Sequence, residues 1–286
     1  MKNKITKNDS WDLIIKPKSG WINVDISEIF KYWDLIFLFV KRDFVTFYKQ
    51  TILGPLWYII QPLFNTVVFT FIFGQVAKIS TDGLPPFLFY LSGNVVWGYF
   101  AHCLSETSKT FISNSQVFGK VYFPRITVPI SIAITSLFQL TIQFLIFIGF
   151  YSYFIFNGAS INPTINVITF PLIILHMALL STGIGMIISA LTAKYRDLSF
   201  AMGFVVQLWM YLTPIVYPLS EVPEKFRIFI LINPMTAVVE SFRGSFLGVS
   251  SITFNEVIAS VVCSIVLFLV GVVVFNRVEK TFMDTV

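Results

Sequence analysis

The sequence predicts an all-α polytopic membrane protein with six transmembrane helices, and three observations predict this class. Of the 286 residues, 56% are hydrophobic and only 12% are charged, whereas a soluble domain carries about a quarter charged residues. Several apolar runs approach the roughly 20 residues that a helix needs to cross a bilayer. The Lys and Arg residues gather in alternate connecting segments, as the positive-inside rule describes.

Two segments precede the first predicted span. Residues 1–26 are polar, lack the apolar core of a signal peptide and predict a cytoplasmic tail. Residues 27–51 predict an amphipathic interface helix, because apolar residues recur at steps of three or four among basic ones. This stripe contains Phe30, Trp33, Phe37, Val40, Phe44 and Phe47. A cytoplasmic helix packed on a partner is the alternative, and the apolar run 35–40 favours the membrane surface.

The membrane domain is predicted to cover residues 52–276, and it begins at the Gly54-Pro55 turn. Pro55 fits the first turn of a new helix because it has no N–H group to donate. The six spans are predicted at residues 52–76, 87–104, 126–156, 167–191, 200–217 and 254–275. Residues 277–286 are predicted to form a second cytoplasmic tail.

The segment 220–251, between spans five and six, is broken by Pro223 and Pro234. Two helices are predicted here, at residues 224–232 and 235–247, and neither is long enough to cross a bilayer. We predict that these two helices are re-entrant at the outer face, since irregular backbone at membrane depth needs protein or water around it.

The charge distribution predicts the orientation of the chain. With this topology, sixteen of the twenty Lys and Arg residues lie on one side of the membrane. The positive-inside rule therefore predicts that both termini are cytoplasmic. The two halves of the sequence do not mirror each other, which weighs against an inverted-repeat secondary transporter.

The sequence carries no catalytic signature, so we predict no enzyme, no catalytic residue and no metal site. Zinc-peptidase and serine-hydrolase motifs are absent, and His102 and His176 stand singly in apolar segments. Gly119-Lys120 lacks the upstream glycine and the following Ser or Thr of a phosphate-binding loop, so no nucleotide cofactor is expected in this chain. The net charge of +5 follows the membrane topology and does not indicate nucleic-acid binding.

The spans carry amides and hydroxyls in place of central charges, which suits an uncharged, hydroxyl-rich substrate. Hydrogen bonding between helices is the alternative role of these amides. Amphipathic side chains in the spans are candidates for a substrate channel, with the interfacial aromatic belt as the alternative. The candidates are Trp57, Tyr58, Gln61, Trp97, Tyr99, Trp209 and Tyr211.

In the inner loop 113–125, apolar and aromatic residues alternate with basic ones. This pattern predicts a short exposed helix whose apolar side chains fill a groove on a partner, with a helix lying on the membrane as the alternative. The apolar residues concerned are Val117, Phe118, Val121, Tyr122 and Phe123.

Several stretches together resemble the permease subunit of ABC-type polysaccharide exporters, the family that moves O-antigen, capsule or teichoic-acid chains. The matching stretches lie between Lys41 and Gly248, in the family's order, and residues 50–62 most resemble the O-antigen branch. They read KRDFVTFYKQTILGPLWYIIQP, SNSQVFGKVYFPR, AKYRDL, and TPIVYP followed by NPMTAVVESFRGSFLG.

The resemblance implies a homodimer with a central lateral channel, joined to two copies of a cytoplasmic ATPase that binds ATP and Mg. It implies that the ATPase is coupled through Gln116, Phe118, Lys120, Tyr122, Phe123, Arg125, Lys194, Tyr195, Arg196 and Asp197. It places Pro234, Glu240 and Arg243 in the outer gate helices. Glu240 and Arg243 are spaced to pair on a helix, and as an exposed pair they would contribute on the order of 0.3–0.5 kcal/mol.

We therefore predict a permease subunit in the bacterial inner membrane that moves lipid-linked polysaccharide, O-antigen first, while a partner chain hydrolyses ATP. Export of capsular or teichoic-acid polysaccharide is the nearest alternative. Two alternatives belong to other classes. One is a transporter or flippase that works alone, and the other is a membrane enzyme that acts on lipid-linked sugars through Glu106 or Asp197.

Overall fold

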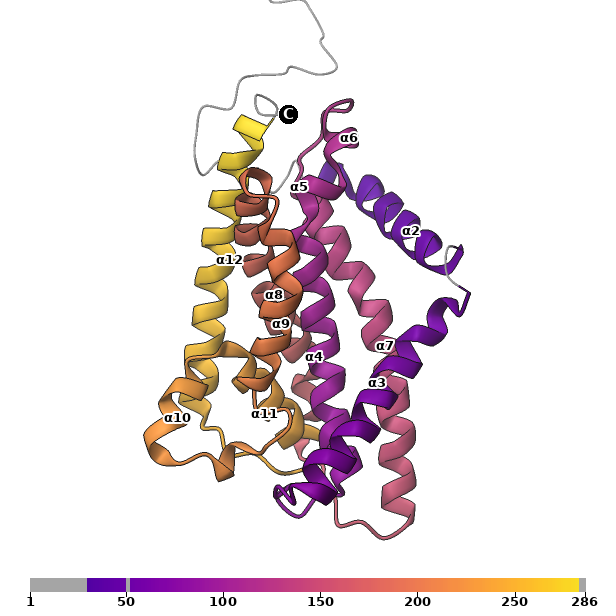
Figure 1. Cartoon of the computed structure of the whole chain (residues 1–286), viewed down its shortest axis with the longest axis vertical. Helices are drawn as coiled ribbons and strands as arrows, with labels where there is room; N and C mark the ends of the chain where they lie inside the picture. Colours follow the sequence, from indigo (N-terminus) through magenta and orange to yellow (C-terminus); the bar gives the residue numbers. More distant parts are fainter. Residues whose placement is uncertain (1–29, 50–51, 283–286) are drawn as a thin grey trace, which may run out of the picture.

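The computed structural model describes residues 30–49 and 52–282. The predicted tail 1–26 and the last four residues of the predicted tail 277–286 lie outside the described residues. Within the described residues the chain is helical and contains no strand (Figure 1). This confirms the all-α class.

The long helices follow the predicted order. Their bounds are α2 Trp33–Lys49, α3 Trp57–Phe69, α4 Pro86–Ser108, α7 Thr127–Phe156, α8 Phe170–Lys194, α9 Leu198–Tyr211, α11 Pro234–Phe246 and α12 Phe254–Phe282. The short helices are η1 Gly54–Leu56, α5 Thr110–Ser113, α6 Ser115–Phe118, η3 Ile165–Thr169, η4 Leu219–Glu221 and α10 Glu224–Leu231, and α3 continues as the π-helical segment η2 Thr70–Val76. Gly54 has a φ of 50°, so the predicted Gly-Pro turn uses the left-handed conformation that glycine adopts readily.

Four helical segments in the described residues are long and apolar enough to cross a membrane: Trp57–Val76, Thr127–Phe156, Ile165–Lys194 and Phe254–Glu279. α4 has 23 residues but carries several polar side chains, and α9 has only 14 residues. The composition of the helices therefore supports four of the six predicted spans.

α4 forms the centre of the bundle and packs against α3, α7, α8, α9 and α11. Its large side chains Tyr90, Tyr99 and Phe100 are fully buried. Because neighbouring helices cover it, α4 can carry polar side chains that lipid would not tolerate. Asn94, for example, donates a hydrogen bond to the Thr66 hydroxyl of α3 over 2.9 Å.

Glycines bring α8 close to both of its neighbours. A Cβ on Gly185 would lie 2.6 Å from the Cβ of Thr107 in α4, and a Cβ on Gly183 would lie 2.6 Å from the Cα of Phe268 in α12. A Cβ on Gly271 of α12 would overlap the carbonyl oxygen of Gly183. Small residues allow this close approach of backbones at membrane helix interfaces. α8 and α12 therefore form one tightly packed pair.

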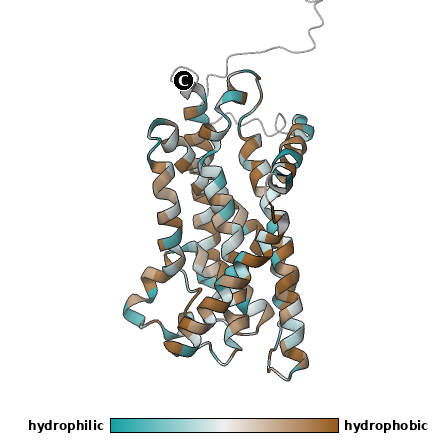
Figure 2. Ribbon diagram, turned by 45° about the vertical axis from the view of Figure 1, so that its right-hand side comes forward, coloured by the Kyte–Doolittle hydropathy of each residue, from teal (hydrophilic) through white to brown (hydrophobic). Residues whose placement is uncertain are grey.

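The bundle has two distinct ends. The short helices α5 and α6 lie at one end together with the C-terminal end of α12, and we call this the α5–α6 end (Figure 1). α10 and α11 lie toward the opposite end, which we call the α10–α11 end. Hydrophobic residues dominate the outer helices along much of their length in Figure 2.

α2 lies obliquely beside α7, near the α5–α6 end (Figure 1). The residues of the predicted apolar stripe have two different environments: Val40 is buried together with Ile36 and Phe39, whereas Trp33 and Phe37 are exposed on the bundle. α2 is apolar on two sides, so its neighbours and not its periodicity select the buried side.

Candidate functional site: coupling loop and outer gate

The predicted coupling loop, residues 113–125, lies at the α5–α6 end, and α6 is its helical part. Val121 is 59% exposed and Tyr122 is 63% exposed, and Gln116 and Lys120 are also exposed. The loop therefore presents one aliphatic and one aromatic side chain beside a basic group.

Two of the predicted exposed side chains are in fact buried. Phe118 is 2% exposed and Phe123 is 4% exposed, so the prediction that they project toward a partner is wrong. Both are needed inside the loop, because a four-residue helix buries too little by itself to hold a fixed conformation.

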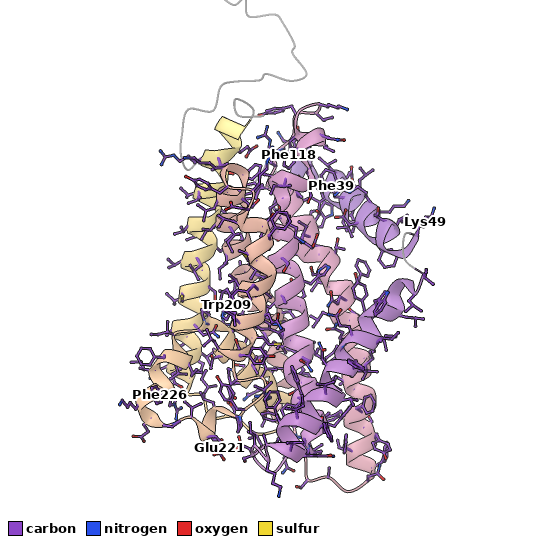
Figure 3. The ribbon with its side chains drawn as sticks, in the orientation of Figure 1. Phe39, Lys49, Phe118, Trp209, Glu221 and Phe226 are labelled. Carbon is purple, nitrogen blue, oxygen red and sulfur yellow. The ribbon has the colours of Figure 1, made fainter. Side chains whose placement is uncertain are left out.

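A row of buried phenylalanine rings joins the loop to three helices. Ring centroids lie 5.6 Å apart for Phe39 of α2 and Phe123, and 5.8 Å apart for Phe123 and Phe118. The row continues from Phe118 to Phe111 of α5 at 6.0 Å, and Phe111 stacks on Phe275 of α12 at 4.5 Å. Figure 3 shows Phe39 and Phe118 near each other at this end. The loop is therefore packed onto α2, α5 and α12.

Polar contacts reinforce this packing on both sides of the loop. Arg42 of α2 donates from Nη1 to the side-chain oxygen of Asn114 over 3.3 Å. Arg125 donates from Nη1 to the carbonyl oxygen of Glu279 in α12 over 2.5 Å, and its guanidinium lies 5.3 Å from the Phe118 ring centroid. Burial lowers the pKa of Arg125, and the negative charge of Glu279 opposes this shift.

The second predicted ATPase contact, residues 194–197, connects α8 to α9 at the same end of the bundle. Lys194, Tyr195, Arg196 and Asp197 are all exposed. The Asp197 carboxylate accepts a hydrogen bond from the N–H of Leu198 over 3.1 Å, which caps α9. The structure thus brings the two predicted contact segments to one end, although they are distant in the sequence.

The predicted channel residues do not share one surface within a single chain. Trp97 and Tyr99 are buried in the core, at 7% and 0% exposure, and so are not open to a path in this structure. The indole N–H of Trp209 donates to the side-chain oxygen of Asn233 over 3.0 Å. Exposed members of the set are Trp57, Gln61 and Tyr211, and partly buried ones are Tyr58 and Trp209.

The predicted gate pair is buried, which corrects the expectation of an exposed pair. Glu240 is 4% exposed, Arg243 is 2% exposed, and their closest N···O distance is 3.8 Å. The sequence correctly predicted that Glu240 and Arg243 are three residues apart on one helix. Whether water reaches the pair depends on the helices and turns packed around α11, which the spacing does not show. An exposed-pair energy does not apply to these charges.

Arg243 joins three separate parts of the chain. It donates to the carbonyl oxygens of Pro214 at 2.6 Å and Ile215 at 2.9 Å, which belong to the turn after α9. Its guanidinium lies 3.7 Å from the centroid of the Phe89 ring in α4. Glu240 accepts a hydrogen bond from the N–H of Ser251 over 2.9 Å. α11 is thereby tied to α4, to the turn after α9 and to the segment before α12.

A second polar contact ties down the start of α11, and the sequence reading missed it. His176 of α8 lies 2.9 Å from the Ser264 hydroxyl and 3.2 Å from the Ser260 hydroxyl of α12. Ser260 donates in turn to the carbonyl oxygen of Pro234 over 2.9 Å. This confirms that His176 is a hydrogen-bonded helix histidine. His102 likewise lies 3.1 Å from the Ser136 hydroxyl. In both cases, serines on a neighbouring predicted span were the sequence feature that could have indicated a partner for the histidine.

The comparison with protein families decides the class of this molecule. The ABC-2 type transporter family matches residues 34–247, which include the coupling loop and all of α11. The chain belongs to the ABC-2 type transporter family. The match extends from α2 to the end of α11, so it contains the coupling loop and the Glu240–Arg243 pair, whereas α12, which contacts both candidate sites, follows the matched residues.

Curated relatives of this ABC-2 transporter are named as polysaccharide export permeases. An O-antigen export system permease protein RfbA from Klebsiella pneumoniae is 28% identical over 253 residues, which cover 88% of this chain and 95% of the relative. An RfbA protein from Myxococcus xanthus is 23% identical and covers 91% of this chain and 98% of the relative. The capsule polysaccharide export inner-membrane protein CtrC from Neisseria meningitidis is 22% identical over 84% of this chain and 89% of the relative.

Proposed function

We propose that this ABC-2 transporter chain is the permease subunit of an ATP-driven exporter that moves lipid-linked polysaccharide out of the bacterial cytoplasm. The observation that carries the proposal is near full-length similarity to proteins named as O-antigen export permeases. O-antigen is therefore the first candidate substrate, and capsular or teichoic-acid polysaccharide is the alternative, which the similarity to a capsule export protein supports.

In this proposal the chain crosses the inner membrane six times, through α3, α4, α7, α8, α9 and α12. Neighbouring helices cover α4, so it does not need an apolar surface of its own. α2 lies on the inner surface of the membrane, and α10 and α11 are re-entrant helices near the outer surface. Both termini are cytoplasmic, which agrees with the concentration of Lys and Arg in the predicted inner segments.

The energy source is a separate cytoplasmic ATPase, which binds ATP and Mg, and two copies of it dock on a homodimer of this chain. Val121 and Tyr122 are the docking side chains, because they are exposed apolar groups on a loop whose inner side is packed. A movement of the docked ATPase would reach α2 and α12 through the buried phenylalanine row. The exposed channel candidates Trp57, Gln61 and Tyr211 would face the substrate path between the two copies.

Replacing Tyr122 with Asp tests the proposal. The variant is expected to insert normally but to lose the co-purifying ATPase and surface polysaccharide, because a charge replaces an apolar contact. Tyr122→Phe is the conservative control, because it keeps the aromatic ring and adds no charge. Normal ATPase retention by Tyr122→Asp would contradict the docking role.

Purification from the native host separates the alternatives. A stoichiometric nucleotide-binding protein supports the exporter, whereas transport by the chain alone in liposomes without ATP would support a stand-alone transporter. An enzyme would need an essential carboxylate, and the two candidates already have local partners. Glu106 pairs with Lys109 at 3.2 Å, and Asp197 caps α9.

A further inference from the structure

A groove of about 300 Å³ lies between α7 and α8. Both helices pack against α4, and they meet each other where Phe144 stacks on Phe170 at 4.6 Å. Between that stack and the α5–α6 end, the walls include the short side chains of Ala133 and Ala178, and Tyr99 of α4 also lines the space. The small residues leave a space that their neighbours do not fill.

The lining of the groove is almost entirely hydrocarbon, and its two hydroxyl groups already donate hydrogen bonds within the protein. Tyr99 donates to the carbonyl oxygen of Ala133 over 3.3 Å, and Thr182 donates to the carbonyl oxygen of Ala178. A polar occupant would leave its own hydrogen-bonding groups unsatisfied there. Water would lack the two to four polar partners that it needs in a cavity. The chemistry of the lining therefore selects an apolar occupant.

The position of the groove identifies its surroundings as lipid. Both walls are candidate membrane spans, and Leu175 on the rim is 53% exposed, so the groove opens sideways. At 1.5 Å per residue, it extends about 16 Å along α7 from Ile126 to Leu137 and about 22 Å along α8 from Pro171 to Met186. The hydrocarbon of one leaflet is about 15 Å deep. The groove is therefore about as long as one leaflet is deep.

The length and the lining of the groove indicate the kind of occupant. A groove that is about as long as one leaflet is deep, opens sideways and is lined by hydrocarbon matches the shape of a single extended hydrocarbon chain. A second helix on this face is distinguished by the test below.

The charge at the two ends of the groove indicates which leaflet supplies the chain. Arg125 directly precedes the groove residue Ile126, where it also donates to the carbonyl oxygen of Glu279 in α12. The exposed Lys194 ends α8, so both walls end in a basic residue at the α5–α6 end. The connection at the opposite end, residues 157–169, contains no Lys or Arg. An anionic headgroup is favoured beside the basic end.

We propose that the groove between α7 and α8 binds one acyl chain of an anionic phospholipid from the leaflet at the α5–α6 end. The chain fills the space between the two helices while its phosphate lies toward the exposed Lys194 at the end of α8. This lipid is distinct from the exported cargo, and its binding does not depend on the proposed export function. It depends only on α7 and α8 lying in a bilayer.

Photolabelling of the full chain in lipid nanodiscs tests the proposal. The probe is phosphatidylglycerol with a diazirine on its acyl chain, and the labelled peptides are identified by mass spectrometry. Label is expected to concentrate on residues 126–137 and 171–186, and the variants Ala133→Phe and Ala178→Phe should each lower it there about tenfold. The controls Leu145→Phe and Leu172→Phe should not, since these leucines are exposed on the same helices outside the groove lining.

Several results would overturn the proposal. Label spread evenly over the exposed helices, or label that survives Ala133→Phe and Ala178→Phe, means that the groove holds no lipid specifically. Equal labelling of the groove by a phosphatidylcholine probe would show that the basic end does not select an anionic headgroup. A disulfide between two copies through Ala178→Cys assigns the groove to a second chain, and displacement of the probe by a polyprenyl phosphate assigns it to the exported lipid. If a filled-groove variant does not fold, the label map of the unmodified chain decides.

Discussion

Arg243 is expected to be a major contributor to the stability of the α10–α11 end, and the substitution Arg243→Met tests this. Methionine keeps most of the length of the side chain but removes the charge and its donors. The change leaves the buried Glu240 carboxylate without its 3.8 Å partner, and the carbonyl oxygens of Pro214 and Ile215 lose their donor. Removing one member of a buried ion pair costs about 3–5 kcal/mol. The free energy of unfolding should fall by that amount.

A second substitution separates the charge from the packing. Glu240→Gln in the Arg243→Met background removes the unpaired charge, while the glutamine oxygen can still accept from the N–H of Ser251. Residues in direct contact show coupling energies of about 0.5–3 kcal/mol. The double variant should therefore regain stability relative to Arg243→Met alone, although it will remain below the unmodified protein.

The assay is denaturant unfolding of the purified chain in detergent micelles, with Arg227→Met as the matched control. Arg227 donates to the carbonyl oxygen of Ser251 over 2.6 Å and lies 3.9 Å from Glu256, but its side chain is 34% exposed. Partly exposed pairs contribute only about 0–1 kcal/mol. An Arg243→Met variant no less stable than the Arg227→Met variant would refute the reasoning, as would a double variant that gains nothing over the single one.

Three further predictions concern packing and the interface helix. Phe118→Ala should lower the free energy of unfolding by about 3–5 kcal/mol because it opens a cavity, whereas exposed Val121→Ala should change it by less than about 0.5 kcal/mol. Gly271→Ala should lower the thermal midpoint because its methyl would overlap Gly183, and Gly149→Ala, with open space around it, should not. Asn114→Ala removes the acceptor from Arg42 and should increase hydrogen exchange in α2 without loss of the loop.

The sequence located the helices well where the signal was local. The predicted third span, residues 126–156, corresponds to α7 Thr127–Phe156, and the predicted helices 224–232 and 235–247 correspond to α10 and α11. In the segment 220–251, Pro223 and Pro234 mark the breaks, because proline ends one helix and favours the first turn of the next. A hydrophobic run and a proline are both visible in a short window of sequence.

Two predicted span ends differ from the ends of the corresponding helices. The fifth span was predicted to continue to residue 217, but α9 ends at Tyr211. Pro214 supplies the reason, since a proline disfavours helical geometry in the residue before it. The sixth span was predicted to end at residue 275, and α12 continues to Phe282, because charged residues can extend a helix beyond the lipid.

Burial depended on contacts that periodicity does not specify. Phe118 and Tyr122 lie four residues apart in the same loop, yet the first is buried and the second is 63% exposed. The difference comes from Phe111 and Phe123, which pack on Phe118 and are themselves packed on Phe275 of α12 and Phe39 of α2. Arg243 is similar, because its burial depends on α4 and on the turn after α9. The misjudged side chains were therefore those whose burial depends on helices distant in the sequence.

α12 connects the two candidate sites through contacts at both of its ends. Phe275 belongs to the buried phenylalanine row at the coupling loop, and Ser260 donates to the carbonyl oxygen of Pro234 at the start of α11. These two residues are 15 positions apart, or about 22 Å along one continuous helix. Between them, the contact of Gly271 with Gly183 holds α12 against α8. A displacement of the loop would therefore reach α11 through α12 only if α8 and α12 move as one body. Weakening the contact between Gly271 and Gly183 should uncouple the loop from α11, while each candidate site keeps its own local packing.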